Sequence, residues 1–292
     1  MDIHYFNITY TCNSNCIFCY SHNTIHSGNV HKEISYIDFT DYLTRKKVGS
    51  HDRVIINGGE PFLHTQIINI LKFLVSIKCE VLIYTNGRLL TKYDFSFLNE
   101  KFRFVIPFHG YRELHDNITR VRGSYDEMYN GVEYLKNFKC KVDMKIVINN
   151  EMVMDEYIFY KSLKSLETFH YNNALHITKM ADTKISIRNQ CKSITNEYAS
   201  IYTAKTFYYF IDKVSCIKIF DTCISDITIT DYNDETISFN VWFKDNIKES
   251  SVELNRCNIS CRNNCKYFQE CASAVGEYTV LEYSEGFRKG LE

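Results

Sequence analysis

The chain has 292 residues, 45% of them hydrophobic and 24% charged, and its formal net charge is −1. It is long enough to bury a sizeable core, and without a sustained basic run it has no electrostatic reason to bind nucleic acid or a membrane surface. Its first residues lack the regions of a signal peptide, and its most apolar helical stretch, residues 67–77, is interrupted by Asn69 and Lys72, so we predict a cytoplasmic protein with no membrane partner.

Short β-rich runs alternate with amphipathic stretches up to about residue 180. Helical periodicity, as in residues 125–138, separates these runs. Six βα units in succession predict an α/β fold, a partial (β/α)6 TIM-type barrel over residues 1–185. The loops after the carboxyl ends of its strands are expected to carry the chemistry. The six predicted strands are residues 4–9, 52–57, 80–85, 102–108, 142–148 and 174–180.

The rest of the chain differs in character. Residues 186–215 are predicted to form a bridging, helical segment, and residues 216–292 a small cysteine-rich C-terminal domain. Within it, residues 226–230 and 236–242 flank the turn-like sequence DYNDE, which predicts a β-hairpin. A cysteine-rich tail begins at Cys257.

Three cysteines lie close together after the first predicted strand. The twelve cysteines of the chain gather toward its two ends, which in a reducing compartment indicates metal or redox chemistry rather than disulfides. Cys12, Cys16 and Cys19 would supply three thiolates to a [4Fe–4S] cube and leave one iron open to a small molecule. The alternative is a zinc site with His22 as the fourth ligand.

The segments that follow resemble the radical S-adenosylmethionine (SAM) superfamily. Phe18, just before Cys19, matches the aromatic position of that family's cysteine loop. Gly58, Gly59 and Glu60, directly after the second strand, match the motif that holds the amino group of SAM; glycines let the backbone approach the ligand and Glu60 can pair with an ammonium. The alternative for this motif is an ordinary strand-to-helix turn.

Two later segments extend the resemblance. Residues 85–87, Thr-Asn-Gly, match a segment common in the superfamily, so Asn86 is expected to face SAM. Residues 104–136 resemble the corresponding region of the subgroup that modifies peptides and proteins. There His109 stands where the pattern usually has Asp, and Arg120 or Arg122 is displaced from the usual arginine position. The resemblance makes His109 and Arg120 candidate contacts of SAM.

A second set of cysteines lies near the C-terminus: Cys257, Cys261, Cys265 and Cys271. Four thiolates can close a second cube with no open iron, and a structural zinc site is the alternative. A hairpin followed by clustered cysteines resembles the SPASM/twitch domains of peptide-modifying relatives, and this resemblance implies one auxiliary [4Fe–4S] cluster.

The remaining cysteines have different expected roles. Cys79 and Cys140 stand at the starts of β runs and are predicted core residues, whereas Cys191 and Cys216 carry no signal beyond that. Cys223 precedes the hairpin in a polar, turn-like sequence. It is either a ligand of the auxiliary cluster or a free thiol at the barrel mouth that can give a hydrogen atom to a carbon radical.

These features most resemble the epimerases of the epipeptide type, which install D-residues in ribosomally made peptides. The resemblance implies that a 5′-deoxyadenosyl radical removes a Cα hydrogen and that a thiol, here Cys223, returns hydrogen to the opposite face. It also implies a precursor peptide as substrate and an external one-electron donor such as flavodoxin or ferredoxin. The alternatives are a maturase that forms thioether or C–C cross-links and, in a different class, a non-catalytic metal-binding module.

Overall fold

A computed structural model describes residues 3–19, 33–169, 171–180, 194, 196–210, 212–219, 226–230 and 236–240. His22, Cys191, Cys223 and all four cysteines of the tail lie outside these residues. The predictions that concern them are therefore not addressed by the fold.

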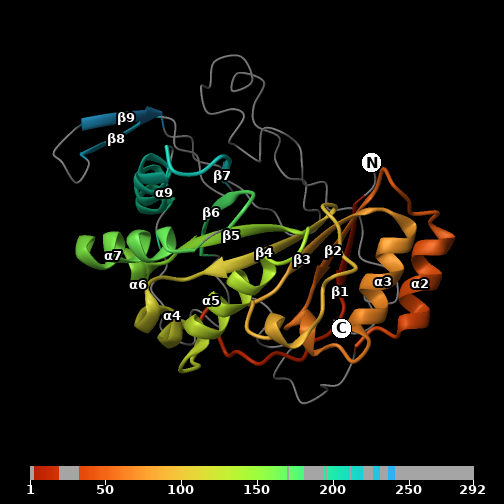
Figure 1. The fold of residues 1–292 in the computed structure, drawn as a ribbon. Coiled ribbons are helices and arrows are strands. Elements are labelled where there is room, and N and C mark those ends of the chain that lie inside the picture. The colour runs from red at the N-terminus through yellow and green to blue at the C-terminus, as the bar shows by residue number, and fades with distance from the viewer. Residues whose placement is uncertain are drawn as a thin grey trace, which may run out of the picture.

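The fold is built on one seven-stranded sheet in which the strands follow one another in chain order (Figure 1). Every neighbouring pair is parallel, so each connection returns the chain to the same edge. All six predicted strands are present, and the partial-barrel α/β fold is confirmed. The strands are β1 (Ile3–Asn7), β2 (Arg53–Asn57), β3 (Glu80–Tyr84), β4 (Phe102–Phe108), β5 (Lys141–Ile148), β6 (Leu175–Lys179) and β7 (Ile217–Ile219).

The seventh strand is a finding that the sequence did not indicate. β7 pairs with β6 through Ile217 opposite Leu175 and Ile219 opposite Ile177. It extends the sheet beyond the six expected strands, although its residues lie in the segment predicted to begin the C-terminal domain.

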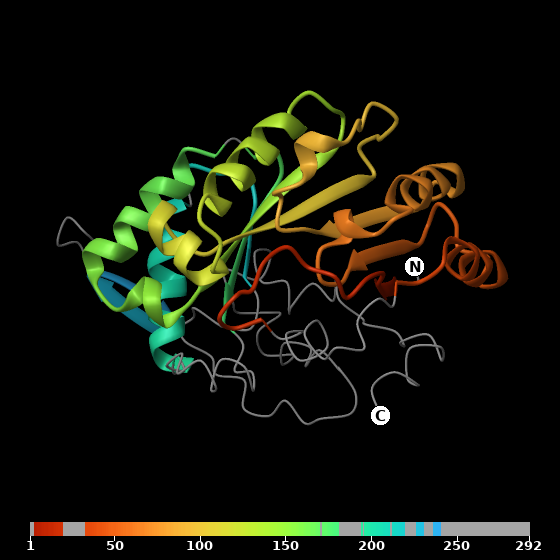
Figure 2. The same ribbon diagram turned by 90° about the horizontal axis from the view of Figure 1, so that it is seen from below.

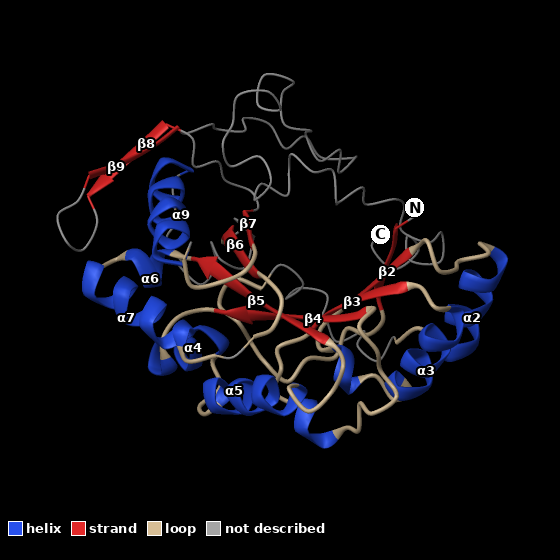
Figure 3. Cartoon of the chain, turned by 45° about the horizontal axis from the view of Figure 1, so that its top comes forward, coloured by secondary structure: helices blue, strands red, loops and turns tan. Residues whose placement is uncertain are grey.

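Helices cover one face of the sheet, as Figure 3 shows for α3, α5 and α7. The bridging segment contains the predicted helix, here α9, and the part of the chain that the structure describes has no helix long and apolar enough to cross a membrane. The helices are α2 (Tyr36–Arg45), α3 (Ile67–Ile77), α4 (Arg112–Thr119), α5 (Ser124–Leu135), α6 (Asn150–Val153), α7 (Glu156–Glu167) and α9 (Asn196–Phe210), with short 3-10 turns η1 (Pro61–Leu63) and η2 (Leu90–Lys92).

The hydrophobic core lies between the sheet and these helices. Alternate residues of each strand point into it, as Phe104, Ile106 and Phe108 of β4 do, because successive side chains of a strand face opposite sides. The predicted core cysteines Cys79 and Cys140 are both buried there. The core therefore fixes which strand residues remain for the opposite, concave face.

The predicted hairpin is also present. β8 (Asp226–Thr230) and β9 (Thr236–Asn240) pair in antiparallel register, with Thr228 opposite Ser238. The turn DYNDE between them lies outside the described residues.

Candidate active site

The loops that follow the strands lie together at the carboxyl edge of the sheet, because all seven strands run in the same direction. The segment after β1 includes residues 11–19, which we call the cysteine loop. This red segment crosses the sheet toward α4 (Figure 2), where Asn15 and Ile17 donate amide hydrogen bonds to the carbonyls of Thr119 and Ile118 over 3.0 and 2.9 Å. The cysteine loop is thus tied to an element about a hundred residues later in the chain.

The two glycines after β2 allow this loop to approach the chain that leads to Cys12. Gly59 donates to the carbonyl of Thr9 over 2.7 Å. A Cβ atom at Gly58 would lie 2.3 Å from the Thr9 carbonyl oxygen, and one at Gly59 would lie 2.3 Å from that of Thr11. The sequence predicted that these glycines let the backbone approach a ligand. In the structure they let the loop approach the backbone of Thr9 and Thr11. Their contact with a ligand stays a prediction.

Glu60 links the loop after β2 to the loop after β3. Its side chain is fully buried and accepts hydrogen bonds from Phe62 N (3.1 Å), Thr85 Oγ1 (2.6 Å) and Asn86 N (2.8 Å). Burial nevertheless raises the pKa of Glu60 above its ordinary value, against the opposing effect of these donors. A cation beside it would favour the charged carboxylate.

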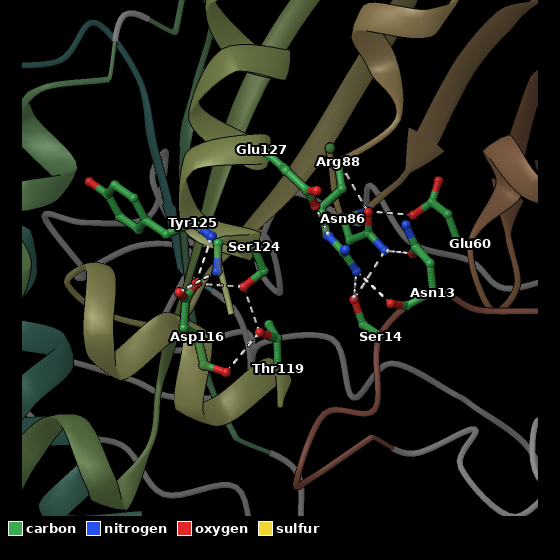
Figure 4. A network of polar contacts seen from close by, with 12 residues as sticks. Asn13, Ser14, Glu60, Asn86, Arg88, Asp116, Thr119, Ser124, Tyr125 and Glu127 are labelled. Carbon is green, nitrogen blue, oxygen red and sulfur yellow. Dashed lines mark hydrogen bonds and ion pairs between the residues drawn. The ribbon is translucent and has the colours of Figure 1, made fainter. Parts of the chain in front are cut away.

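The loop after β3 is hydrogen-bonded to the cysteine loop through Asn86 and Arg88 (Figure 4). Asn86 Nδ2 donates to Asn13 Oδ1 over 2.7 Å. Arg88 Nη1 donates to the Asn13 carbonyl and to Ser14 Oγ, the latter over 3.1 Å. Arg88 Nε donates to Glu127 of α5 over 2.5 Å. Glu60, Asn86 and Arg88 therefore join the loops after β2 and β3 to each other, to the cysteine loop and to α5.

The three cysteines are free thiols of intermediate exposure. Burial raises the pKa of Cys12 and of Cys16 to about 12 in each case, which disfavours the thiolates, and a bound iron would favour them. In the described parts of the chain no three His, Cys, Asp or Glu side chains are placed to share one metal ion. A [4Fe–4S] cube has no such requirement, because each thiolate binds its own iron. Three thiols on one loop therefore fit a cube with one open iron.

Phe18 and His109 lie in contact, although they come from different loops. Their ring centroids are 5.3 Å apart with an edge-on geometry. The ring centroid of His109 also lies 5.2 Å from that of His115 of α4. His109 is buried, and its Nδ1 has no hydrogen-bond partner within the described residues. Burial lowers the pKa of His109 well below its ordinary value. A neutral imidazole with an open nitrogen therefore stands beside the cysteine loop.

Arg120 ends α4 in a left-handed conformation with φ of 56° and its side chain is exposed. It directly follows Thr119, whose carbonyl accepts from Asn15 of the cysteine loop. The structure places Arg120 beside that loop, and its contact with SAM stays a prediction.

Asp116 connects α4, which is hydrogen-bonded to the cysteine loop, to the start of α5. Its carboxylate accepts from Gly123 N (2.6 Å), Ser124 Oγ (2.9 Å) and Tyr125 N (2.9 Å) at the start of α5. These donors lower the pKa of Asp116 against the effect of burial. Asp116 thus accepts hydrogen bonds from the amides at the N-terminus of α5, whose N-cap residue is Gly123.

The face of the sheet opposite the core carries a buried polar cluster on β4, β5 and β6, beside the small apolar cluster of Ile55 and Leu82. Asp143 on β5 is buried, its Oδ2 lies 2.8 Å from His176 Nε2 on β6 and 3.9 Å from Arg103 Nε on β4. Burial alone would raise the pKa of Asp143, but His176 and its other partners lower it. Lys145 lies over the ring of Tyr84 at 5.7 Å from the centroid. The Asp143 cluster therefore lies near the amino edge of the sheet, away from the cysteine loop at the carboxyl edge.

Residues 6–157, more than half of the chain, match the model of the radical SAM superfamily. The chain belongs to this superfamily. Membership implies a [4Fe–4S] cluster and SAM as cofactors. The order of the cysteine loop, the Gly-Gly-Glu loop and the Thr-Asn-Gly loop along successive strands agrees with this assignment.

Relatives of known function are distant. The AdoMet-dependent heme synthase of Oleidesulfovibrio alaskensis is 21% identical over 220 residues, which cover 74% of this chain and 54% of the relative. The chain therefore spans about half the length of that curated relative.

Among the solved structures that share the fold are two with bound peptides. One is anSMEcpe with bound AdoMet and the Cp18Cys peptide, 16% identical with a TM-score of 0.56, covering 92% of this chain and 87% of that one. The other is Streptococcus suis SuiB bound to the precursor peptide SuiA, 15% identical with a TM-score of 0.51, covering 73% of this chain and 46% of that one.

Sequence reasoning missed the residues that hold the cysteine loop in place. Asn13 and Ser14 lie inside the cysteine motif, Arg88 directly follows the Thr-Asn-Gly segment, and Glu127 lies on α5. Only the position of Arg88 after a recognised segment offered a signal, and its partners are 39 and 74 residues away in the chain.

Replacing Glu60 with glutamine is expected to weaken SAM binding by roughly tenfold, because the charge opposite the ammonium is lost. Stability should also fall, by about 1–3 kcal/mol, because an amide nitrogen cannot accept from the donors that surround the carboxylate. Anaerobic equilibrium dialysis with SAM and thermal unfolding measure the two effects.

Thr85→Val is the matched control for this variant. It removes the 2.6 Å hydrogen bond to Glu60 but keeps the carboxylate charge. It should lower the free energy of unfolding and leave SAM affinity nearly unchanged. If Glu60→Gln is destabilised yet binds SAM like the wild type, Glu60 serves only to connect the loops.

Proposed function

We propose that this chain modifies a ribosomally made precursor peptide and that its reaction is the epimerisation of L-residues to D-residues. The observation that carries the proposal is the convergence of the cysteine, Gly-Gly-Glu and Thr-Asn-Gly loops at one edge of a radical SAM sheet. The peptides bound to anSMEcpe and SuiB, proteins of similar fold, support a peptide substrate.

In this proposal Cys12, Cys16 and Cys19 hold the cluster. When bound, the cluster and SAM supply a 5′-deoxyadenosyl radical that removes hydrogen from carbon. Glu60 pairs with the ammonium of SAM, while the open nitrogen of His109 faces a polar group of the same ligand. Selectivity then depends on how closely the chain clamps one Cα–H bond beside the radical.

The hydrogen that returns to carbon is proposed to come from Cys223. Three other cysteines outside the cysteine loop lie within the described residues: Cys79, Cys140 and Cys216. Each directly precedes a parallel strand, so each lies at the amino edge of the sheet, opposite the cysteine loop. The carbonyl of Cys216, for example, accepts from Leu175 at the start of β6. This arrangement supports a donor from the segments outside the described residues.

The remaining elements of the proposal rest on sequence. They are the domain boundaries after residues 185 and 215 and a flavodoxin or ferredoxin as electron donor. A further one is the auxiliary cluster, held by Cys257, Cys261, Cys265 and Cys271.

The proposal is tested by incubating the reconstituted enzyme with SAM, reductant and candidate precursor peptides in heavy water. Epimerisation should yield a D-residue that carries one solvent deuterium on the inverted carbon, because a thiol proton exchanges with solvent before transfer. Chiral amino-acid analysis and mass spectrometry measure both. A product that has lost two hydrogens without inversion would replace epimerisation by cross-linking, and SAM cleavage indifferent to every peptide would remove the peptide substrate.

A further inference from the structure

Arg88 occupies a position between the cysteine loop and α5 that the proposed function does not use. Its side chain is only 10% exposed. One side of the guanidinium binds the Asn13 carbonyl and Ser14 Oγ, and its Nε binds Glu127. Asn13 and Ser14 lie between Cys12 and Cys16 in the sequence, so Arg88 contacts the loop within the proposed ligand set.

The segment that carries Arg88 is itself held firmly. Gly87 has a φ of 80°, and a Cβ at Gly131 of α5 would lie 2.1 Å from the Gly87 carbonyl oxygen. α5 thus packs directly against this loop, and Asn86 connects the loop to Glu60 and Asn13. Arg88 therefore extends from a rigid base, as a residue that positions another group must.

The charge of Arg88 has an asymmetric environment. Its partner Glu127 is 50% exposed, so solvent screens that carboxylate more than the nearly buried guanidinium. Reduction of a cluster adds negative charge, which a nearby cation stabilises and a nearby carboxylate opposes. Removing the charge of Arg88 should therefore lower the reduction potential of the cluster, and removing the charge of Glu127 should raise it.

We propose that Arg88 is a positioning residue that holds the cysteine loop in its ligand geometry, and that the Arg88–Glu127 pair sets the reduction potential of the cluster bound there. This inference rests on the proposed cluster at Cys12, Cys16 and Cys19. Its two parts are the geometry of the loop and the charge beside it, and they can be measured separately.

The geometric part is tested in the cluster-free protein by hydrogen exchange of the cysteine loop. In Arg88→Gln the amides of Asn15 and Ile17 should exchange roughly tenfold faster, because the loop loses its hydrogen bonds to a charged group. Arg88→Lys keeps the charge but lacks the fork of donors, so its exchange should also accelerate.

The electrostatic part is tested by an EPR-monitored redox titration of the SAM-responsive cluster in the loaded enzyme. Arg88→Gln should disfavour reduction and Glu127→Gln should favour it, each by at least about threefold in the equilibrium constant, or about 28 mV at 59 mV per tenfold. Arg88→Lys keeps the positive charge, so the cluster should have the reduction potential of the wild type. The amides of its cysteine loop should nevertheless exchange faster than in the wild type.

The control is the exposed pair of Arg112 on α4 and Asp126 on α5, with side chains 54% and 48% exposed. Arg112→Gln should change neither exchange of the cysteine loop nor the potential, because such exposed pairs contribute little. Shifts of equal sign in Arg88→Gln and Glu127→Gln, or no shift in Glu127→Gln, would overturn the electrostatic part. Unchanged exchange in Arg88→Lys would overturn the geometric part. A wild type that binds no cluster at this loop would instead refute the proposed function.

Discussion

Replacement of Cys12, Cys16 and Cys19 together by alanine is expected to lower the iron content of the anaerobically reconstituted enzyme from about eight to about four per chain. Deoxyadenosine formation should fall to background. The reason is that only the cysteine loop offers three thiols with one cluster iron left open for SAM, whereas the tail offers four. Iron and sulfide analysis with chromatography of the SAM products measures both effects.

Cys79→Ala is the control for this experiment. Cys79 is fully buried at the start of β3 and lies at the opposite edge of the sheet. Its loss creates a small cavity and should cost stability without removing iron. Stoichiometric zinc with little iron in the wild type, or unchanged iron in the triple variant, would contradict the assignment of the cysteine loop.

Replacement of Cys223 by alanine should abolish D-residue formation while both clusters, SAM binding and deoxyadenosine formation remain. Initiation needs only the first cluster and the substrate Cα–H bond, so the variant loses the step that returns hydrogen. The Cα radical should then decay into abortive products. Chiral analysis of the peptide, iron content and deoxyadenosine yield, measured on one sample, give the result.

Cys216→Ala is the matched control, since Cys216 lies before β7 at the amino edge of the sheet. It should keep full epimerisation. If Cys223→Ala loses iron, Cys223 is a ligand of the auxiliary cluster. If the variant keeps its iron and its D-residue yield, the donor lies elsewhere, and Cys191 is the next to test because it also lies outside the described residues.

The six predicted strands and the hairpin were predictable because their signals are local. Runs such as residues 102–108 and 142–148 are rich in β-branched and aromatic residues, and turn-forming or helical segments separate them. β7 was not predictable in this way. Ile217–Ile219 is only three residues long, and its extended conformation is decided by pairing with β6, which is a contact between distant parts of the chain.

The sequence by itself determined the superfamily and the order of the loops, and it predicted the thiols of the first cluster, because each of these is a short motif whose chemistry follows from adjacent residues. The tertiary structure alone decided what surrounds them. Gly58 and Gly59 are needed because a side chain there would clash with the carbonyls of Thr9 and Thr11. The carboxylate of Glu60 accepts from three donors. Arg88 donates hydrogen bonds to Glu127 and Ser14. Such contacts depend on parallel strands that return every loop to one edge, and no local pattern records which side chains will meet there.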